Sequence, residues 1–395
     1  MNKNVLVINC GSSSVKFALV NAGSGEQPIT GLAEKLGGKE GLISWRFNGG
    51  DKFSKVLEAP THLCALKAVV RILEEESLLG SVIAVGHRLV HGGEHFSKST
   101  LIDDNVLSAV EACSSLAPLH NPANITGVKT TMQLLPKLPQ VGVFDTAFHQ
   151  TLPERAFLYP LPYEYYEKYS VRKYGFHGTS HRYVSQKAAK MLNRPLESLA
   201  LLSAHLGNGC SAASILNGKS LDTTMGLTPL EGLVMGTRSG DIDPGLHAYL
   251  AKTLDKGIDE VTDILNKKSG LLGLSGVSND MRELLAAAKE GNSRANIAVE
   301  VFCYRLAKAL AALAVPLGRI DALIFTGGIG ENSVPVREKV LNNLGIFGFE
   351  VDSALNVKHG KETVGRITKE TGTLAMVVPT DEEYMIAKDT LELID

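Results

Sequence analysis

The chain has 395 residues, which is enough for two or three domains, and its 44% hydrophobic and 21% charged residues are ordinary for a globular protein. A net charge of −2 argues against a broad nucleic-acid surface, and no stretch approaches the roughly 18 apolar residues of a membrane span. The five cysteines are odd in number, widely spaced and without a C-x-x-C pair, which indicates reduced thiols in a cytoplasmic protein. We expect no signal peptide, because a predicted strand begins at the N-terminus.

Apolar runs with helical patterns between them predict an α/β protein. The predicted strands cover residues 5–9, 15–20, 82–90, 141–146, 200–206, 212–217, 322–328 and 374–380. The clearest predicted helix covers 296–315, where steps of three and four residues place on one face Val299, Phe302, Cys303, Leu306, Ala309, Leu310 and Leu313.

The first two predicted strands are joined by the short turn Cys-Gly-Ser-Ser-Ser, followed by Lys16. Backbone N–H groups of such a turn, with Ser hydroxyls and a lysine, suit a phosphate. A hairpin with a solvated lysine is the alternative. The chain has no G-x-x-x-x-G-K-[ST] loop, and no strand is followed by G-x-G-x-x-G, so the two common nucleotide fingerprints are absent.

Residues 199–221 repeat the plan of strand, small polar turn and strand about 200 residues later, with Gly207, Asn208 and Gly209 in the turn. Two such hairpins favour a duplicated domain, one copy in each half, although chance similarity is the alternative. The segment 153–170, rich in Pro and Tyr, is the predicted connection.

Charged residues lie near the ends of two predicted strands. Arg88 with the apolar Val90 nearby suits a small carboxylate, and a structural salt bridge is the alternative. Asp145 ends another strand, where a carboxylate either caps a turn or faces a ligand crevice. Metal binding by the nearby histidines is a weaker alternative on spacing, at His87, His91 and His95.

Two further motifs contain candidate catalytic residues. His177 stands between Phe176 and Gly178, where a structural histidine is the alternative. Arg238 lies in a loop between Gly236 and Gly240, which suits an arginine against a ligand. The later Asp241 and Asp243 in this loop favour an ordinary turn over a metal site.

A glycine-rich segment, 326–336, follows a predicted strand and suits either a ledge for a nucleotide's sugar and base or a turn needing positive φ. Ser333 with Pro335 predicts the start of a helix. Asp280 with Glu283 forms a possible capping box.

The motifs occur together in the order seen in acetate kinases, and the resemblance covers essentially the whole chain. They are NCGSSSVKF, GHRLVHGG, FDTAFH, YGFHGTSH, HLGNG, GTRSGDIDPG, TGGIGENS and PTDEE. Propionate kinases look very similar. The resemblance implies two duplicated actin-like (ribonuclease H-like) α/β domains facing a nucleotide cleft. Residues 1–149 with a C-terminal helix, 383–395, would form the acid-binding domain, and 150–382 the nucleotide-binding domain with the dimer interface.

The resemblance also implies a role for individual residues. Asp145, His177 and Arg238 would be catalytic, and Asn9 with Glu382 would hold a metal. Acid binding would involve Arg88, with an alkyl pocket formed by Val90, Leu119, Phe176 and Pro229. Nucleotide binding would involve Lys16, His205, Leu206, Gly207, Asn208, Gly209, Asp280, Met281, Arg282, Gly328, Ile329, Gly330, Glu331 and Asn332.

The implied reaction is reversible phosphoryl transfer from ATP to acetate, giving ADP and acetyl phosphate, with Mg²⁺ that Mn²⁺ can replace. The resemblance further implies a homodimer with no nucleic-acid or membrane partner. A short-chain acid such as propionate is the alternative acceptor. An actin-like regulatory or scaffold ATPase would explain the hairpins and the glycine-rich segment, but not Arg88, Arg238 or the small apolar pocket.

Overall fold

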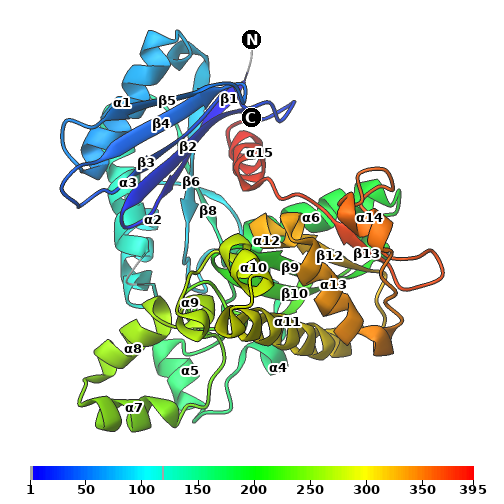
Figure 1. The fold of residues 1–395 in the computed structure, drawn as a ribbon. Coiled ribbons are helices and arrows are strands. Elements are labelled where there is room, and N and C mark those ends of the chain that lie inside the picture. Colours follow the sequence, from blue (N-terminus) through cyan, green and yellow to red (C-terminus); the bar gives the residue numbers. More distant parts are fainter. Residues whose placement is uncertain (1–2, 118–119) are drawn as a thin grey trace. The chain divides into compact units, whose positions relative to one another are not determined.

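A computed structural model describes residues 3–117 and 120–395. The chain forms two compact units, coloured along the sequence in Figure 1. Unit 1 comprises Met1–Gln150 and Asp381–Asp395, and unit 2 comprises Thr151–Thr380. Within the described ranges, no helix is both long and apolar enough to cross a membrane.

Unit 1 contains an eight-stranded sheet in its described part, in the order β5-β4-β3-β2-β1-β6-β8-β7. Its strands are β1 (Asn4–Cys10), β2 (Ser14–Asn21), β3 (Ile29–Glu34), β4 (Leu42–Phe47), β5 (Lys52–Val56), β6 (Val82–Leu89), β7 (Thr100–Leu101) and β8 (Gln140–Phe144). Its helices are α1 (His62–Glu75), α2 (Asp104–Ala112), α3 (Asn121–Leu134) and α15 (Glu382–Ile394).

Strand β1 is buried on both faces, which explains its continuous apolar run. Leu6 and Ile8 belong to a core that includes residues of α1, whereas Val5 and Val7 share a second core with Ile386 of α15. Side chains alternate between the faces of a strand, so Asn9 lies on the same face as Val5 and Val7. The C-terminal helix therefore covers the face on which the polar end of β1 lies (Figure 1).

Unit 2 contains a five-stranded sheet in the order β11-β10-β9-β12-β13. Its strands are β9 (Ala200–Leu206), β10 (Cys210–Leu216), β11 (Lys219–Thr223), β12 (Ala322–Thr326) and β13 (Ala375–Val377). Its helices are α4 (Glu154–Phe157), α5 (Glu164–Tyr169), α6 (Gly178–Met191), α7 (Leu246–Leu254), α8 (Ile258–Lys267), α9 (Gly270–Ser275), α10 (Met281–Lys289), α11 (Ser293–Ala314), α12 (Gly327–Asn332), α13 (Val334–Asn343) and α14 (Ser353–Val357).

The two sheets share one topology. In unit 1 the strands β3, β2 and β1 pair antiparallel, and β6 and β8 then add in parallel. In unit 2 the strands β11, β10 and β9 pair antiparallel, and β12 and β13 then add in parallel. This repetition confirms the predicted α/β class and the predicted duplication. The β1–β2 turn therefore has the same place in the sheet of unit 1 as the β9–β10 turn has in the sheet of unit 2.

All eight predicted strands are present, but β3, β4, β5, β7 and β11 were not predicted. The predicted helix 296–315 lies within α11 except at its last residue, and its apolar face is buried except for Ala309, which is half-buried. The predicted connection 153–170 contains the short helices α4 and α5. Helix α13 begins after Ser333 with Pro335 in its first turn, as predicted.

Helix α15 approaches the sheet most closely at Gly86 of β6. A Cβ atom at this position would lie 2.6 Å from Oγ1 of Thr390 and 2.7 Å from Cγ2 of Ile386. We expect Gly86→Ala to lower stability by about 1–3 kcal/mol, because the added methyl group overfills this contact. Thermal unfolding measures the effect. The matched control is Gly80→Ala, since nothing lies within 4 Å of its added Cβ; equal midpoints for both variants would contradict the close packing of α15.

Candidate active site

Three polar side chains form a row across adjacent strands of unit 1. Asn9 on β1 is directly opposite Lys16 on β2, and the parallel register of Ile8 with His87 places Arg88 of β6 beside Asn9. The row lies on the sheet face covered by α15, and Arg88 lies at the carboxyl end of β6. Ligands of α/β sheets commonly bind at carboxyl ends of strands.

Arg88 and Asp145 form a two-point ion pair at these strand ends. Nε of Arg88 donates to Oδ1 of Asp145 at 3.1 Å, and Nη2 donates to Oδ2 at 2.5 Å. The Asp145 side chain is 2% exposed and that of Arg88 is 20% exposed. Burial alone would lower the pKa of Arg88, but Asp145 and then Glu382 raise it above its usual value. The structural salt bridge considered from the sequence is therefore present.

Arg88 also has capacity for a further ligand. Its Nη1 donates to Oδ1 of Asn9 at 3.3 Å, so three of the about five guanidinium N–H groups have partners among the described residues. The remaining N–H groups, on a side chain that is partly exposed, can donate to an anion. Asp145 fixes the plane in which they point.

Carboxylates of α15 lie beside the same row. One small hollow of unit 1 has these carboxylates and the polar row in its lining: Glu382, Glu383, Asn9, Lys16 and Arg88. Lys16 forms an ion pair with Glu383. Burial raises the pKa of the neighbouring Glu382, and the positive charge of Arg88 partly offsets this rise. The start of α15 thus brings residues from the end of the chain beside the end of β1.

Asn9 and Glu382 supply oxygen ligands of the kind that hard divalent cations bind. Glu382 is half-buried, burial raises the pKa of its carboxyl group, and it lines the same small hollow as Asn9. No cluster of three or more His, Cys, Asp or Glu suited to a metal occurs in the described residues, but Mg²⁺ keeps several waters and needs only one or two carboxylates. The two residues therefore fit such an ion.

The histidine metal site considered from the sequence is not formed. His87 lies on the sheet face opposite to Arg88, where its Nε2 hydrogen-bonds with Oε1 of Gln140 at 2.7 Å. Burial lowers the pKa of His87 to about 4. This histidine is a neutral core residue.

The first small polar turn is held by its own backbone and by α1. The N–H of Gly11 donates to the carbonyl of Ser14 at 2.8 Å, and Nε2 of His62 donates to the carbonyl of Gly11 at 2.7 Å. Ser12 and Ser13 are exposed. The turn is thus fixed while two of its three serines, Ser12 and Ser13, remain accessible to a ligand.

In unit 2, His177 belongs to a network of imidazole rings and serine hydroxyls. Its Nδ1 and Nε2 of His181 both contact Oγ of Ser211, at 2.9 and 2.8 Å, and Nδ1 of His181 contacts Oγ of Ser203 at 2.9 Å. Since a serine hydroxyl has one proton, Ser211 donates to at most one of the two rings. The ring of His177 also stacks on His205, with centroids 4.3 Å apart.

His177 and Arg238 converge on the second small polar turn. A Cβ atom built at Gly209 would lie 3.6 Å from Nε2 of His177 and 3.6 Å from Nη1 of Arg238. Nη1 of Arg238 also donates to the carbonyl of Pro229 at 3.0 Å. Because Nδ1 of His177 is bound to Ser211, its Nε2 is the nitrogen near Gly209. Unit 2 thus brings together two of the three predicted catalytic residues.

A cavity of about 820 Å³ lies in unit 2, within the range of about 300–1,000 Å³ typical of ligand pockets. Its walls come from the β9–β10 turn, the start of α10, α12 and the start of α13. The predicted nucleotide-binding residues among them are Gly207, Asn208, Asp280, Met281, Arg282, Gly328, Ile329 and Asn332. Hydrogen bonds from Arg282 lower the pKa of Asp280 to about 2, and Asp280 is the N-cap of α10.

Other predicted nucleotide residues do not line this cavity. Leu206 is fully buried, and His205 stacks on His177. Glu331 lies in α12, but Oε1 of its carboxylate accepts the backbone N–H groups of Gly327 at 2.9 Å and Thr380 at 3.1 Å. Its side chain therefore fixes α12 to the chain segment that leads to α15.

The glycine-rich segment is a short helix, and the turn alternative is also partly present. Gly327 begins α12 with φ of +75°, and a Cβ there would lie 2.9 Å from the carbonyl oxygen of Leu206. Arg337, fully buried and absent from the sequence predictions, donates through Nη1 to the carbonyls of Gly330 and Glu331 at 2.9 and 2.8 Å. It supports the C-terminal end of α12.

The predicted alkyl pocket takes its residues from different parts of the chain. Val90 is buried in unit 1, Phe176 is buried in unit 2, and Pro229 of unit 2 is half-buried. Leu119 lies outside the described residues. The pocket stays a prediction. The N–H of Gly245 donates to Oδ1 of Asp243 at 2.9 Å, so the predicted turn is present at Asp243. Asp241 instead accepts the N–H of Gly232, nine residues away, at 2.7 Å.

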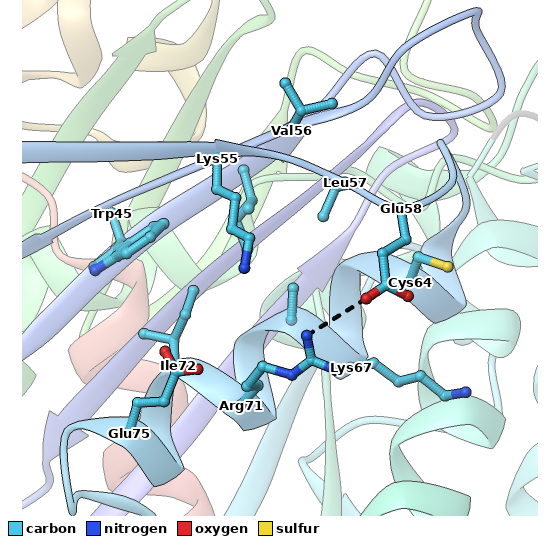
Figure 2. Close-up of a pocket in the computed structure, with 12 residues that line it drawn as sticks. Trp45, Lys55, Val56, Leu57, Glu58, Cys64, Lys67, Arg71, Ile72 and Glu75 are labelled. Carbon is cyan, nitrogen blue, oxygen red and sulfur yellow. Dashed lines mark hydrogen bonds and ion pairs between the residues drawn. The ribbon is translucent and has the colours of Figure 1, made fainter.

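A second hollow in unit 1, between the β4–β5 hairpin and α1, is shown in Figure 2. Its volume is only about 70 Å³, well below that of ordinary ligand pockets. Arg71 is paired with Glu58 at 3.4 Å, and Lys55 and Lys67 share the rim with these two residues and Glu75. Its mixed charges and small size do not support a substrate site.

A model of the acetokinase family matches residues 4–388. The chain belongs to the acetokinase family. It is 54% identical over 393 residues to the acetate kinase of Chromobacterium violaceum, an alignment that covers 100% of this chain and 99% of that protein. The family assignment predicted from the ordered motifs is therefore confirmed, and this acetokinase is a kinase that transfers phosphate to a carboxylate.

Solved structures of similar proteins agree with the family. The propionate kinase of Francisella tularensis matches with a TM-score of 0.95 and 46% identity, covering 99% of this chain and 100% of that chain. The acetate kinase of Porphyromonas gingivalis matches with a TM-score of 0.93 and 45% identity, covering 100% of both chains.

We expect Glu331→Ala to weaken adenine-nucleotide binding by about tenfold, because the N–H groups of Gly327 and Thr380 lose their acceptor and α12 forms one wall of the cavity. Glu331→Gln keeps an Oε1 acceptor and should lose less. Calorimetric titration with ADP measures both variants. The control is Glu338→Ala on α13; equal affinities for Glu331→Ala and Glu338→Ala would contradict this role for Glu331.

Proposed function

We propose that this acetokinase transfers the terminal phosphoryl group of ATP to acetate, reversibly, giving acetyl phosphate and ADP. The observation that carries the proposal is the 54% identity, over the full chain, to a protein named acetate kinase. The Arg88–Asp145 pair supports it, because a fixed and partly exposed guanidinium suits a small carboxylate. The 46% identity to a propionate kinase favours propionate as the alternative acceptor.

The acceptor needs no general base. Acetate resembles a side-chain carboxyl group, with a pKa of about 4 to 5, so it is already ionised at pH 7. Asp145 is buried and bound at two points to Arg88, which supports a role in orienting the cation that binds the acid. Asp145 would then act on the arginine and not on a proton of the substrate.

The main obstacle is bringing an anionic acceptor to a polyphosphate. Arg88 would bind the acid, and Arg238 with Nε2 of His177 would stabilise the phosphoryl group as it transfers in line. The network of Ser211 and His181 supports this role for His177, because it holds the other ring nitrogen and orients the imidazole. The reaction would then depend on positioning and charge stabilisation.

The cavity of unit 2 would hold the nucleotide, with Gly207 and Asn208 near the phosphates and Asp280 to Arg282 near the nucleoside. Asn9 and Glu382 would hold Mg²⁺, or Mn²⁺ in its place, which would offset the charge of the phosphates. Lys16 would reach the phosphates by leaving its ion pair with Glu383, and its side chain is more than half exposed.

The protein would act in the cytoplasm as a homodimer. The described cysteines are all free, which suits a reducing compartment. Unit 2 presents exposed apolar side chains on α5, α7 and α8 that a second copy would cover, including Tyr169, Tyr249 and Ile258.

We expect hydroxylamine to trap an acyl phosphate from a mixture of the protein, ATP, Mg²⁺ and acetate. Coloured hydroxamate measures the product, and reactions without acetate or without protein are the controls. ATP hydrolysis with no hydroxamate from acetate or propionate would favour a regulatory ATPase and overturn the proposal.

The two arginines should differ kinetically. Arg88→Ala should raise KM for acetate much more than KM for ATP, because it removes a binding contact to the acid. Arg238→Ala should mainly lower kcat, by roughly 10³-fold, because its contacts strengthen in the transition state. Steady-state rates with each substrate varied separate the two patterns, and the reverse assignment would show that the two roles are exchanged.

A further inference from the structure

The chain leaves β6 at Leu89 and continues as a buried segment, residues 90–92, that pairs with none of the described strands. Val90 is 4% exposed and His91 is fully buried. Buried backbone N–H and C=O groups need partners. This segment begins two residues after Arg88 and includes Val90, so whatever binds its backbone also places the acid-binding residues.

Side chains supply the hydrogen-bond partners that a neighbouring strand would otherwise provide to this segment. The N–H of Val90 donates to Oδ1 of Asn124 at 3.0 Å, and the N–H of His91 donates to Oδ1 of Asn121 at 3.2 Å. Nδ2 of Asn121 returns a hydrogen bond to the carbonyl of His91 at 3.0 Å. The N–H of Gly92 donates to Oγ1 of Thr146 at 3.2 Å.

Asn124 alone among these side chains also binds β1. Its Nδ2 donates to the carbonyl of Cys10 at 2.6 Å, at the residue that follows Asn9. The parallel register of β1 and β6 ends at the pair of Ile8 and His87. Beyond that pair, the side-chain amide of Asn124 bridges the ends of the two strands. Its oxygen accepts the N–H of Val90, and its nitrogen donates to the carbonyl of Cys10.

Helix α3 presents to the strand ends a face that allows this contact. Asn121, Asn124 and Gly127 are spaced three residues apart and so share one helix face, and α3 packs on β1 and β6 (Figure 1). A Cβ at Gly127 would lie 2.3 Å from Sγ of Cys10, so glycine permits the close approach of α3 to the end of β1. Both asparagines are buried with their hydrogen-bonding groups engaged.

We propose, on the basis of the proposed function, that Asn124 is a positioning residue that sets the spacing between Asn9 and the acid-binding pair Arg88 and Val90. Asn9 and Arg88 are 3.3 Å apart at Oδ1 and Nη1, a contact that both strand ends must keep. Loss of the amide releases the backbone at both ends. A shift of about 1 Å in a reacting group can cost about 10²-fold in rate.

The test compares Asn124→Ala and Asn124→Leu with the control Thr131→Ala. Leucine refills much of the volume without restoring either hydrogen bond. Thr131 lies on the same helix, is 2% exposed, and donates from Oγ1 to the carbonyl of Gly127 at 2.7 Å. Thermal unfolding reports stability, and hydroxamate formation from acetate, ATP and Mg²⁺ reports kinetics.

Both Asn124 variants should lower kcat/KM for acetate by at least about tenfold, while KM for ATP changes by less than about threefold. Thr131→Ala should lower the unfolding midpoint but keep kcat/KM within about threefold. If Asn124 were purely structural, the loss in kcat/KM for acetate would instead follow the loss in unfolding midpoint across all three variants, or Asn124→Leu would restore activity by refilling the volume. Either result would overturn the proposal.

A structural readout separates this proposal from the proposed function. In crystal structures of the alanine variants, the contact between Asn9 and Arg88 should be lost in Asn124→Ala and kept in Thr131→Ala. If wild-type protein forms no acyl phosphate, the proposed function fails, and this distance still decides whether Asn124 sets the spacing. An unchanged distance in Asn124→Ala would overturn the proposal for Asn124 alone.

Discussion

The ion pair between Arg88 and Asp145 is the interaction on which the polar face of unit 1 depends. Each charge needs the other, because removing one partner of a buried pair typically costs about 3–5 kcal/mol. The pair joins the ends of β6 and β8, and its geometry leaves Nη1 of Arg88 directed at Asn9. The same contact thus secures the fold and sets the direction in which the guanidinium can meet a ligand.

The two units use one sheet topology for different chemistry. At the strand ends of unit 1 the side chains are charged, and the pairing of Arg88 with Asp145 and of Lys16 with Glu383 organises them. At the equivalent place in unit 2 the groups are imidazoles, hydroxyls and the guanidinium of Arg238, beside a cavity of about 820 Å³. Duplication supplied equivalent turns at β1–β2 and β9–β10, and the side chains around them diverged.

Residues with conspicuous chemistry could be found from the sequence, whereas the contacts that side chains make with the backbone could not. Arg88, Asp145, His177 and Arg238 stand at motif positions and carry charge or an imidazole. Asn124 has no such signal, because an asparagine near a helix start is common. Its proposed role depends on the N–H of Val90 and the carbonyl of Cys10, two backbone groups that the register of β1 and β6 does not pair with each other.

The amino-acid sequence by itself determined the α/β class, the duplication, the family and most of the candidate residues, because apolar runs and ordered motifs are local properties of the chain. It missed β5, because an exposed strand at a sheet edge has no apolar run. Only the tertiary structure decided that Glu331 binds the backbone N–H groups of Gly327 and Thr380. Such partners depend on which backbone groups the sheet leaves unpaired, and segments distant in the sequence meet only when the chain has folded.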